Sequence, residues 1–225
     1  IIQARIGSRR LRGKILRKIK GKEILLLLLN RLSKSKLIKD IIIVIPNTRE
    51  NNKLAFFLRK KKFKVFRGSE NNVLERYYMC AKKFSVKNIL RITSDCPLID
   101  PKLIDKIGNI YLKNKYDYVS NVEKRTFPDG MDIEFFNFKA LKKAFLNSIS
   151  DYDKEHVTKY ILRSDKFNRY NYLSNKNFSN LRITLDRIED FHLINKIFCN
   201  FKRNDFTYED ILNLYKKNKQ LFLVN

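Results

Sequence analysis

The chain has 225 residues, enough for one sizeable domain with its own hydrophobic core. Apolar residues make up 44% and aromatic residues 12% of the sequence, which excludes an intrinsically disordered chain. Lysine and arginine total 49 against 23 aspartate and glutamate, so the formal net charge is +26. This charge favours anionic ligands.

The positive charge does not by itself indicate a nucleic-acid-binding protein. The basic residues are spread along nearly every expected element, with only a brief cluster at 59–62. Lysine, isoleucine and asparagine are abundant together, and all three have A/T-rich codons, so a composition bias accounts for much of the charge. Nucleic-acid binding as the main role is therefore disfavoured, whereas a nucleoside triphosphate is a suitable ligand.

Membrane and disulfide signals are absent from the sequence. No segment reaches the roughly 18 uncharged apolar residues that span a bilayer, and the run 24–29 is far too short. Three cysteines are odd in number and lack the paired spacing of a zinc site, which favours a reducing cytoplasm: Cys80, Cys96 and Cys199. The chain opens at Ile1 inside an expected strand, so we expect a few residues to precede it.

Short β-branched runs alternate with longer amphipathic segments along the chain. Expected strands cover 1–4, 41–45, 64–66, 88–92, 116–120, 133–136 and 182–184. Expected helices cover 24–33, 51–61, 72–84, 101–114, 137–147, 154–163, 188–198 and 208–217. The alternation predicts one α/β domain over residues 1–225, with a mostly parallel sheet between helices. Ligands of such sheets bind beyond the carboxyl ends of the strands.

The loop at 5–14, after the first expected strand, gathers cations around two glycines. A glycine-containing turn exposes backbone N–H groups that can cradle phosphate, and arginine suits bidentate phosphate contacts. A Walker P-loop has four residues between its glycine and the Gly-Lys pair, and serine or threonine follows the lysine. Here five residues separate Gly7 from the Gly13–Lys14 pair and Ile15 follows, so this loop is not a P-loop. A solvated basic turn is the alternative to a phosphate site.

Two aspartates each follow an expected strand and precede an expected helix. Asp95 comes after 88–92 and Asp186 after 182–184. Mg²⁺ takes one or two carboxylates together with phosphate oxygens and water, so both are candidate ligands. Helix capping is the alternative for Asp186. Asp100, which directly precedes Pro101, is expected to be a helix N-cap.

Two further segments carry candidate groups, each with a structural alternative. Asp129, Asp132 and Glu134 surround one turn and strand, where a solvated hairpin is the alternative. His156 follows Glu155 near the start of an expected helix, where a structural role is the alternative.

The motifs, in their order, resemble those of the cytidylyltransferase family. That family includes the spore coat polysaccharide biosynthesis protein F type and, more distantly, the acylneuraminate and 3-deoxy-manno-octulosonate cytidylyltransferases. Residues 3–14 resemble the opening signature, 91–100 the metal-aspartate motif and 184–190 the late motif with a second metal aspartate. Segments 67–78 and 155–158 match as well. The resemblance extends from Gln3 to about Asp190.

The resemblance implies a three-layer, Rossmann-like fold of the nucleotide-diphospho-sugar transferase type. It also implies transfer of CMP from CTP to a sugar or sugar acid with release of pyrophosphate, for surface polysaccharide biosynthesis. The family resemblance further implies a Mg²⁺ cofactor and a homodimer.

The resemblance assigns site residues as well. Catalytic roles fall on Arg5, Lys14, Asp95 and Asp186, with both aspartates binding Mg²⁺. The implied nucleotide contacts are Ala4, Arg5, Gly7, Ser8, Arg10, Lys14, Arg67, Ser69 and Arg76. The implied acceptor-sugar contacts are Asn121, Asp129, Asp132, Glu155 and His156.

Several positions depart from the family pattern, among them Asn71 and Asn72, where the family commonly has one or two aspartates. Arg9 stands where the family has serine or threonine, Arg12 where it has proline, and Ser94 where it has glycine. These last three changes leave open a degenerate member that acts only as a partner protein. A sugar-nucleotide pyrophosphorylase using another base is a second alternative, because phosphate and metal contacts do not identify the base. A basic nucleic-acid-binding module is a third, because of the net charge of +26.

Overall fold

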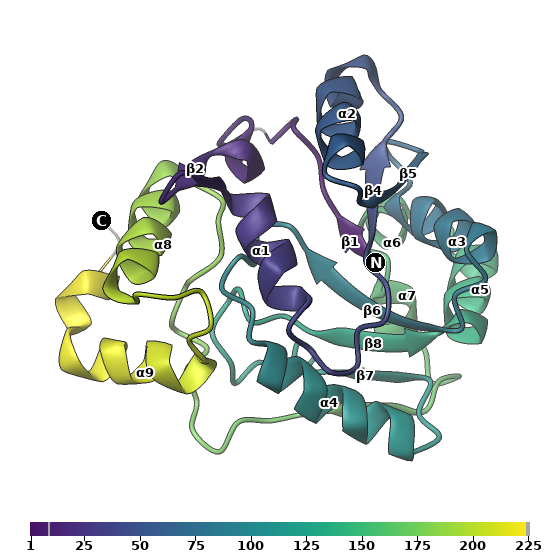
Figure 1. Ribbon diagram of the computed structural model, residues 1–225. Coiled ribbons are helices and arrows are strands. Elements are labelled where there is room, and N and C mark those ends of the chain that lie inside the picture. Colours follow the sequence, from purple (N-terminus) through teal and green to yellow (C-terminus); the bar gives the residue numbers. More distant parts are fainter. Residues whose placement is uncertain (9, 224–225) are drawn as a thin grey trace.

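Strand β1 (Ile2–Gln3) lies in the interior of a seven-stranded sheet in the computed structural model, which describes residues 1–8 and 10–223. The strand order is β5-β4-β1-β6-β8-β7-β9 (Figure 1). The other strands are β4 (Ile42–Pro46), β5 (Lys64–Gly68), β6 (Asn88–Thr93), β7 (Tyr118–Ser120), β8 (Glu134–Asn137) and β9 (Arg169–Asn171). Only β8 runs antiparallel to its neighbours within this sheet, so the prediction of a mostly parallel sheet is confirmed.

Helices cover both faces of the sheet. The helices are α1 (Ile24–Leu32), α2 (Asn52–Lys60), α3 (Val73–Lys83), α4 (Pro101–Lys113), α5 (Phe138–Asn147), α6 (Asp151–His156), α7 (Lys159–Arg163), α8 (Ile188–Asn200) and α9 (Tyr208–Lys217). Short 3₁₀ turns cover Lys14–Leu16, Arg49–Asn51 and Lys219–Phe222. No helix in the described part of the chain is long and apolar enough to cross a membrane.

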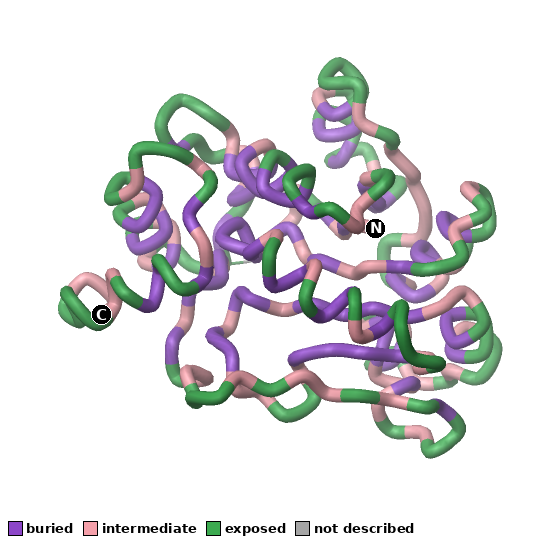
Figure 2. Tube along the Cα trace, turned by 60° about the horizontal axis from the view of Figure 1, so that its bottom comes forward, coloured by how far each residue is buried: buried purple, intermediate pink, exposed green. Residues whose placement is uncertain are grey.

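Two hydrophobic cores form because successive strand residues point to opposite faces. In β4, Ile43 and Ile45 join the core under α1, α2 and α4, whereas Ile42 and Val44 join the core under α3 and α5. Buried residues consequently run through the middle of the molecule, and exposed residues gather at its periphery (Figure 2). The result is the predicted three-layer arrangement.

Two expected elements differ in the structure. The helix expected over 154–163 is broken into α6 and α7, because Val157 has a positive φ of 58° that a helix does not accommodate. The strand expected at 182–184 is a single parallel bridge between Asp129 and Arg182. Gly130, at φ 110°, permits this contact, since a Cβ there would lie 2.8 Å from the Ile183 backbone.

The sequence patterns did not predict three short strands. Strands β2 (Lys18–Ile19) and β3 (Lys22–Glu23) form a separate hairpin around Lys20 and Gly21, which both have positive φ. Strand β9 adds to the edge of the main sheet beside β7. Segments of two or three residues are too short to show a strand periodicity.

Candidate active site

The first loop and the Asp95 loop leave neighbouring parallel strands at the same edge of the sheet. Strands β1 and β6 pair in register, with Gln3 opposite Thr93. The chain runs from β1 outward to β4 and β5 before it returns to β6 on the other side of β1. This reversal is the topological switch point, where ligands of open α/β sheets bind.

Lys14 joins the two predicted metal aspartates. Its side chain is largely buried, and its Nζ atom donates a hydrogen bond to Asp186 Oδ1 at 2.8 Å. The same ammonium lies 3.5 Å from Asp95 Oδ2 and donates to the Leu185 carbonyl at 2.5 Å. The tertiary structure therefore brings together two carboxylates that are 91 positions apart in the sequence, with one cation between them.

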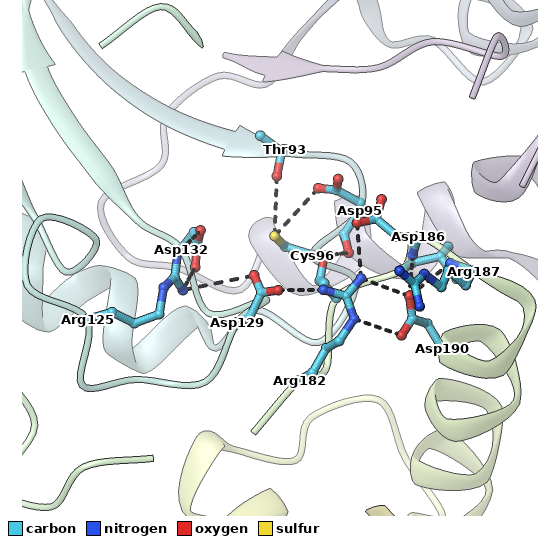
Figure 3. Close-up of polar contacts among 12 residues, drawn as sticks. Thr93, Asp95, Cys96, Arg125, Asp129, Asp132, Arg182, Asp186, Arg187 and Asp190 are labelled. Carbon is cyan, nitrogen blue, oxygen red and sulfur yellow. Dashed lines mark hydrogen bonds and ion pairs between the residues drawn. The ribbon is translucent and has the colours of Figure 1, made fainter. Parts of the chain in front are cut away.

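Backbone contacts hold the late motif against the Asp95 loop. The Leu185 N–H donates to the Asp95 carbonyl at 2.8 Å, and the Thr184 hydroxyl donates to the same carbonyl at 3.1 Å. Because these bonds use the main chain of Asp95, its carboxylate stays free to face Lys14 and Asp186. The two aspartate side chains lie next to each other in Figure 3.

Arg182 contacts three carboxylates with one guanidinium group (Figure 3). Its Nη2 lies 3.0 Å from Asp186 Oδ2, its Nη1 lies 2.9 Å from Asp129 Oδ2, and its Nε lies 3.0 Å from Asp190 Oδ1. Asp190 also accepts the Asp186 N–H at 2.7 Å at the start of α8. No sequence signal pointed to Arg182 as a site residue, because its partners meet only through tertiary folding.

The charges around Asp186 keep it ionised. Burial opposes ionisation, but hydrogen bonds from Lys14 and Arg182 outweigh it, so the pKa of Asp186 lies below its ordinary value of 3.8. Burial, and then the charge of Asp95, raises the pKa of the Cys96 thiol well above its ordinary value. Cys96 is therefore a neutral thiol near neutral pH and not a nucleophile.

A cavity of about 690 Å³ opens beside the two aspartates. Most of the predicted site residues line it: Ala4, Arg5, Gly7, Ser8, Arg10, Lys14, Arg76, Asp95, Glu155, His156 and Asp186. Its size is suited to a nucleotide together with part of a second substrate. The strand order thus gathers loop residues, two carboxylates and the start of α3 around one space.

Two predicted nucleotide contacts lie outside the cavity wall. Arg67 donates from Nη2 to the Thr48 carbonyl at 2.9 Å. The Ser69 hydroxyl accepts the Asn72 N–H at 3.1 Å, while Asn72 itself caps α3. Arg76, which does line the cavity, donates to the Ser69 carbonyl at 2.5 Å. Arg67 and Ser69 therefore shape the turn before α3.

Three predicted acceptor contacts also lie outside the wall. The buried Asn121 amide donates to the Met131 carbonyl at 2.7 Å and accepts the Ile133 N–H at 2.9 Å, so it fastens the turn between β7 and β8. Asp132 forms a two-pronged ion pair with Arg125 at 2.6 and 2.9 Å. Asp129 pairs with Arg182 instead (Figure 3). Burial and the Asp132 charge raise the pKa of Asp129.

Three residues at or beneath the cavity had no assigned role in the sequence analysis. Arg91 and Gln3 line the cavity, and the Arg91 Nη2 donates to Gln3 Oε1 at 3.1 Å. Arg91 also forms an ion pair with Glu134, which is buried in β8. In the sequence Glu134 stands out only as one of three neighbouring carboxylates, because strand alternation does not reveal a partner on another strand.

The positions that depart from the family pattern have separate surroundings. Arg12 pairs with Glu50 at 2.9 Å on an exposed part of the loop, and a Cβ at Gly7 would approach the same carboxylate to 2.8 Å. Ser94 lines the cavity, and its N–H donates to the Gln3 carbonyl. Arg9 lies outside the described residues.

The residues present fit a Mg²⁺ ion that arrives with a nucleotide. Within 1–8 and 10–223, no three histidine, cysteine, aspartate or glutamate side chains gather into a metal site. Asp95 and Asp186 nevertheless flank one cation, the Lys14 ammonium. Two carboxylates are the usual protein share of a Mg²⁺ site whose remaining ligands are phosphate oxygens and water.

A model of the cytidylyltransferase family matches the chain over residues 1–225. The chain belongs to the cytidylyltransferase family. It is 38% identical over 228 residues to the uncharacterized protein MJ1063 of Methanocaldococcus jannaschii, covering 100% of this chain and 93% of that protein. It is 30% identical over 229 residues to the spore coat polysaccharide biosynthesis protein SpsF of Bacillus subtilis, covering 97% of this chain and 93% of SpsF.

Solved structures agree with this membership. A cytidylyltransferase from Leptospira borgpetersenii superposes with a TM-score of 0.95 at 33% identity, covering 100% of this chain and 95% of that one. A CMP:2-keto-3-deoxy-manno-octonic acid synthetase complexed with CTP shares the fold, with a TM-score of 0.67 at 14% identity and coverage of 88% and 97%. The predicted family, the nucleotidyltransferase class and the α/β fold are confirmed.

Proposed function

We propose that this enzyme transfers CMP from CTP to an oxygen of a sugar or sugar acid and releases pyrophosphate. One observation carries the proposal: Lys14 joins Asp95 and Asp186 at the edge of a cavity lined by the cationic first loop. The names of two relatives support the substrate class, since one is a spore coat polysaccharide biosynthesis protein and the other a CMP-sugar acid synthetase bound to CTP.

The first loop supplies the groups that bind the triphosphate in this proposal. Arg5, Arg10 and Lys14 line the cavity, and their charges suit phosphate oxygens. Arg76 of α3 favours a polar ligand in this part of the cavity, because its buried Nε has no hydrogen-bond partner among the described residues. A buried donor of this kind is costly unless a ligand or water satisfies it.

In the proposed reaction an acceptor hydroxyl oxygen forms a bond to the α-phosphorus and loses its proton to water. The bond from the α-phosphorus to the bridging oxygen breaks, and pyrophosphate leaves with that electron pair. Lys14 and Arg10 compensate the negative charge that develops on the leaving group. Asp95 and Asp186 would hold Mg²⁺, which when bound supplies Lewis-acid polarisation of the phosphoryl oxygens.

The Asp95→Asn variant tests the proposal. CTP-dependent pyrophosphate release should fall by about 100-fold or more, because a carboxylate beside the reacting phosphate is lost. The matched control is Asp151→Asn, whose side chain is fully exposed on α6 and, among the described residues, forms an ion pair only with Lys154. Turnover by Asp95→Asn equal to that of the control, with both variants folded, would contradict the proposal.

A substrate panel identifies the base and the acceptor. CTP, UTP, GTP and ATP are each tested with keto-sugar acids and sugar phosphates while pyrophosphate is detected. Turnover with another nucleotide in place of CTP would indicate the pyrophosphorylase alternative. The cytoplasmic location and the homodimer stay predictions. Analytical ultracentrifugation tests whether the protein forms a homodimer.

A further inference from the structure

The break between α6 and α7 is an unusual γ-turn centred on Val157. The Thr158 N–H donates to the His156 carbonyl at 2.6 Å, and Val157 has φ 58° and ψ −56°. This is the rare form of the γ-turn, and positive φ is especially unfavourable for a β-branched residue. Strained backbone of this kind persists only where surrounding contacts enforce it, and it gathers at functional sites.

Two sets of contacts enforce the turn. The Val157 side chain is fully buried in the hydrophobic core under α3 and α5, so the turn cannot rotate outward without exposing it. The Thr158 hydroxyl donates to Glu134 Oε1 at 2.6 Å, and the Tyr118 hydroxyl donates to the same oxygen at 2.8 Å. The turn is therefore tied to a buried carboxylate of the central sheet.

That carboxylate is also connected to the cavity. Arg91 pairs with Glu134 Oε2 and donates to Gln3 Oε1, and both Arg91 and Gln3 line the cavity. Glu134 thus accepts hydrogen bonds from the turn with one oxygen and from the cavity floor with the other. A buried network in which every member is satisfied fixes side-chain positions within narrow limits.

The strained turn determines where the preceding residues lie. His156 and Glu155 line the cavity, and the His156 ring packs against Tyr152 with 4.5 Å between the ring centroids. We propose that Thr158 and Glu134 are positioning residues, which hold the Val157 turn so that the His156 imidazole contacts the acceptor sugar. This inference rests on the proposed function.

The charges of the cavity wall around Glu155 and His156 favour binding of the acceptor sugar over binding of the triphosphate. Glu155 adds a carboxylate beside His156, and a carboxylate repels phosphate. Burial lowers the pKa of His156 below its ordinary 6.5, the charge of Glu155 opposes this, and Lys159 and Arg91 add smaller lowerings, so the ring is neutral near pH 7. A neutral imidazole both donates and accepts hydrogen bonds, which suits sugar hydroxyls.

The test compares Thr158→Val, which keeps the branched shape but removes the hydroxyl, with the conservative control Thr158→Ser. The chain has only two histidines, so imidazole NMR signals of His156 can be followed during a pH titration with exposed His192 as internal reference. In Thr158→Val the pKa of His156 should rise above its wild-type value, and in Thr158→Ser it should stay low. A His156 titration identical in both variants and the wild type would overturn the proposed positioning.

Kinetics test the functional part. Thr158→Val should raise the KM for the acceptor by about fivefold or more and change the KM for CTP by less than about twofold. Thr158→Ser should leave both KM values near those of the wild type. Equal changes in the two KM values would indicate a general structural defect and overturn the acceptor assignment. The NMR titration needs no turnover, so a wild-type enzyme inactive with CTP would sink the proposed function without affecting that measurement.

Discussion

Lys14 and Asp186 are 172 positions apart in the chain, yet the Lys14 Nζ donates to the Asp186 carboxylate at 2.8 Å. The lysine ammonium also lies 3.5 Å from Asp95. Lys14 therefore shares one positive charge between the two carboxylates that are the candidate Mg²⁺ ligands, and Arg10 and Arg182 pair with Asp186 as well.

Replacing Lys14 by methionine should change metal binding and catalysis in opposite directions. With the one cation that contacts both aspartates removed, the protein should bind Mg²⁺ about three- to tenfold more tightly, although Arg10 and Arg182 still pair with Asp186. Turnover should fall by about 100-fold, because the charge near the leaving pyrophosphate is lost. Titration calorimetry with Mg²⁺ alone and steady-state kinetics measure the two effects. Lys82→Met, at an exposed position on α3, is the control, and unchanged Mg²⁺ affinity in Lys14→Met would refute the competition.

Replacing Arg182 by lysine should reduce both stability and turnover. A single ammonium cannot reproduce the guanidinium contacts to Asp129, Asp186 and Asp190. We expect a loss of about 1–2 kcal/mol in the free energy of unfolding, measured by urea denaturation. We also expect a fall in kcat, since Asp186 loses one of its supports. The control is Arg203→Lys, whose side chain is largely exposed, and an equal result for the two variants would exclude a special role for Arg182.

Acid should destabilise the protein partly through Asp190. Burial opposes its ionisation, but Arg182 and two backbone N–H groups outweigh it, so its folded pKa lies below the ordinary 3.8. Its contribution to stability is therefore complete above the unfolded pKa and is lost as pH falls through the folded pKa. The difference in unfolding free energy between wild type and Asp190→Asn should shrink from pH 5.5 toward pH 3. A constant difference over this range would contradict the assignment, and Asp151→Asn serves as the exposed control.

Asp100 is the N-cap of α4 and also accepts a backbone N–H at the start of α9, whose own N-cap is Thr207. Its Oδ1 accepts the Lys102 N–H of α4, as the sequence predicts for an N-cap, and its Oδ2 accepts the Tyr208 N–H of α9. Asp100→Ala should lower the unfolding free energy by about 2–4 kcal/mol, since each lost acceptor at a helix start costs about 1–2 kcal/mol. Asp100→Asn keeps one acceptor oxygen and should lose about half as much. An Asp100→Asn midpoint equal to that of the wild type would show that the contact to Tyr208 is energetically neutral.

Local sequence was sufficient wherever the relevant physics is local. Helix α9 has the predicted bounds of 208–217, and the Asp100–Pro101 cap begins α4, because periodicity and capping depend on neighbouring residues. The cationic first loop could be recognised for the same reason. The break at Val157 could not, because its strained φ is enforced by Glu134 from a different strand.

The alternation of strands and helices, the charge of the first loop and the order of the family motifs can be inferred from the amino-acid sequence alone. Which of those charges meet depends on how distant segments pack together. Asp95 and Asp186 face Lys14 because parallel strands β1 and β6 release their loops at one edge and the 184–186 segment docks on the Asp95 backbone. Asp129 and Asp132 face arginines instead, because the turn at Gly130 packs against Ile183. Contacts between distant segments depend on strand order and packing, which local spacing does not encode.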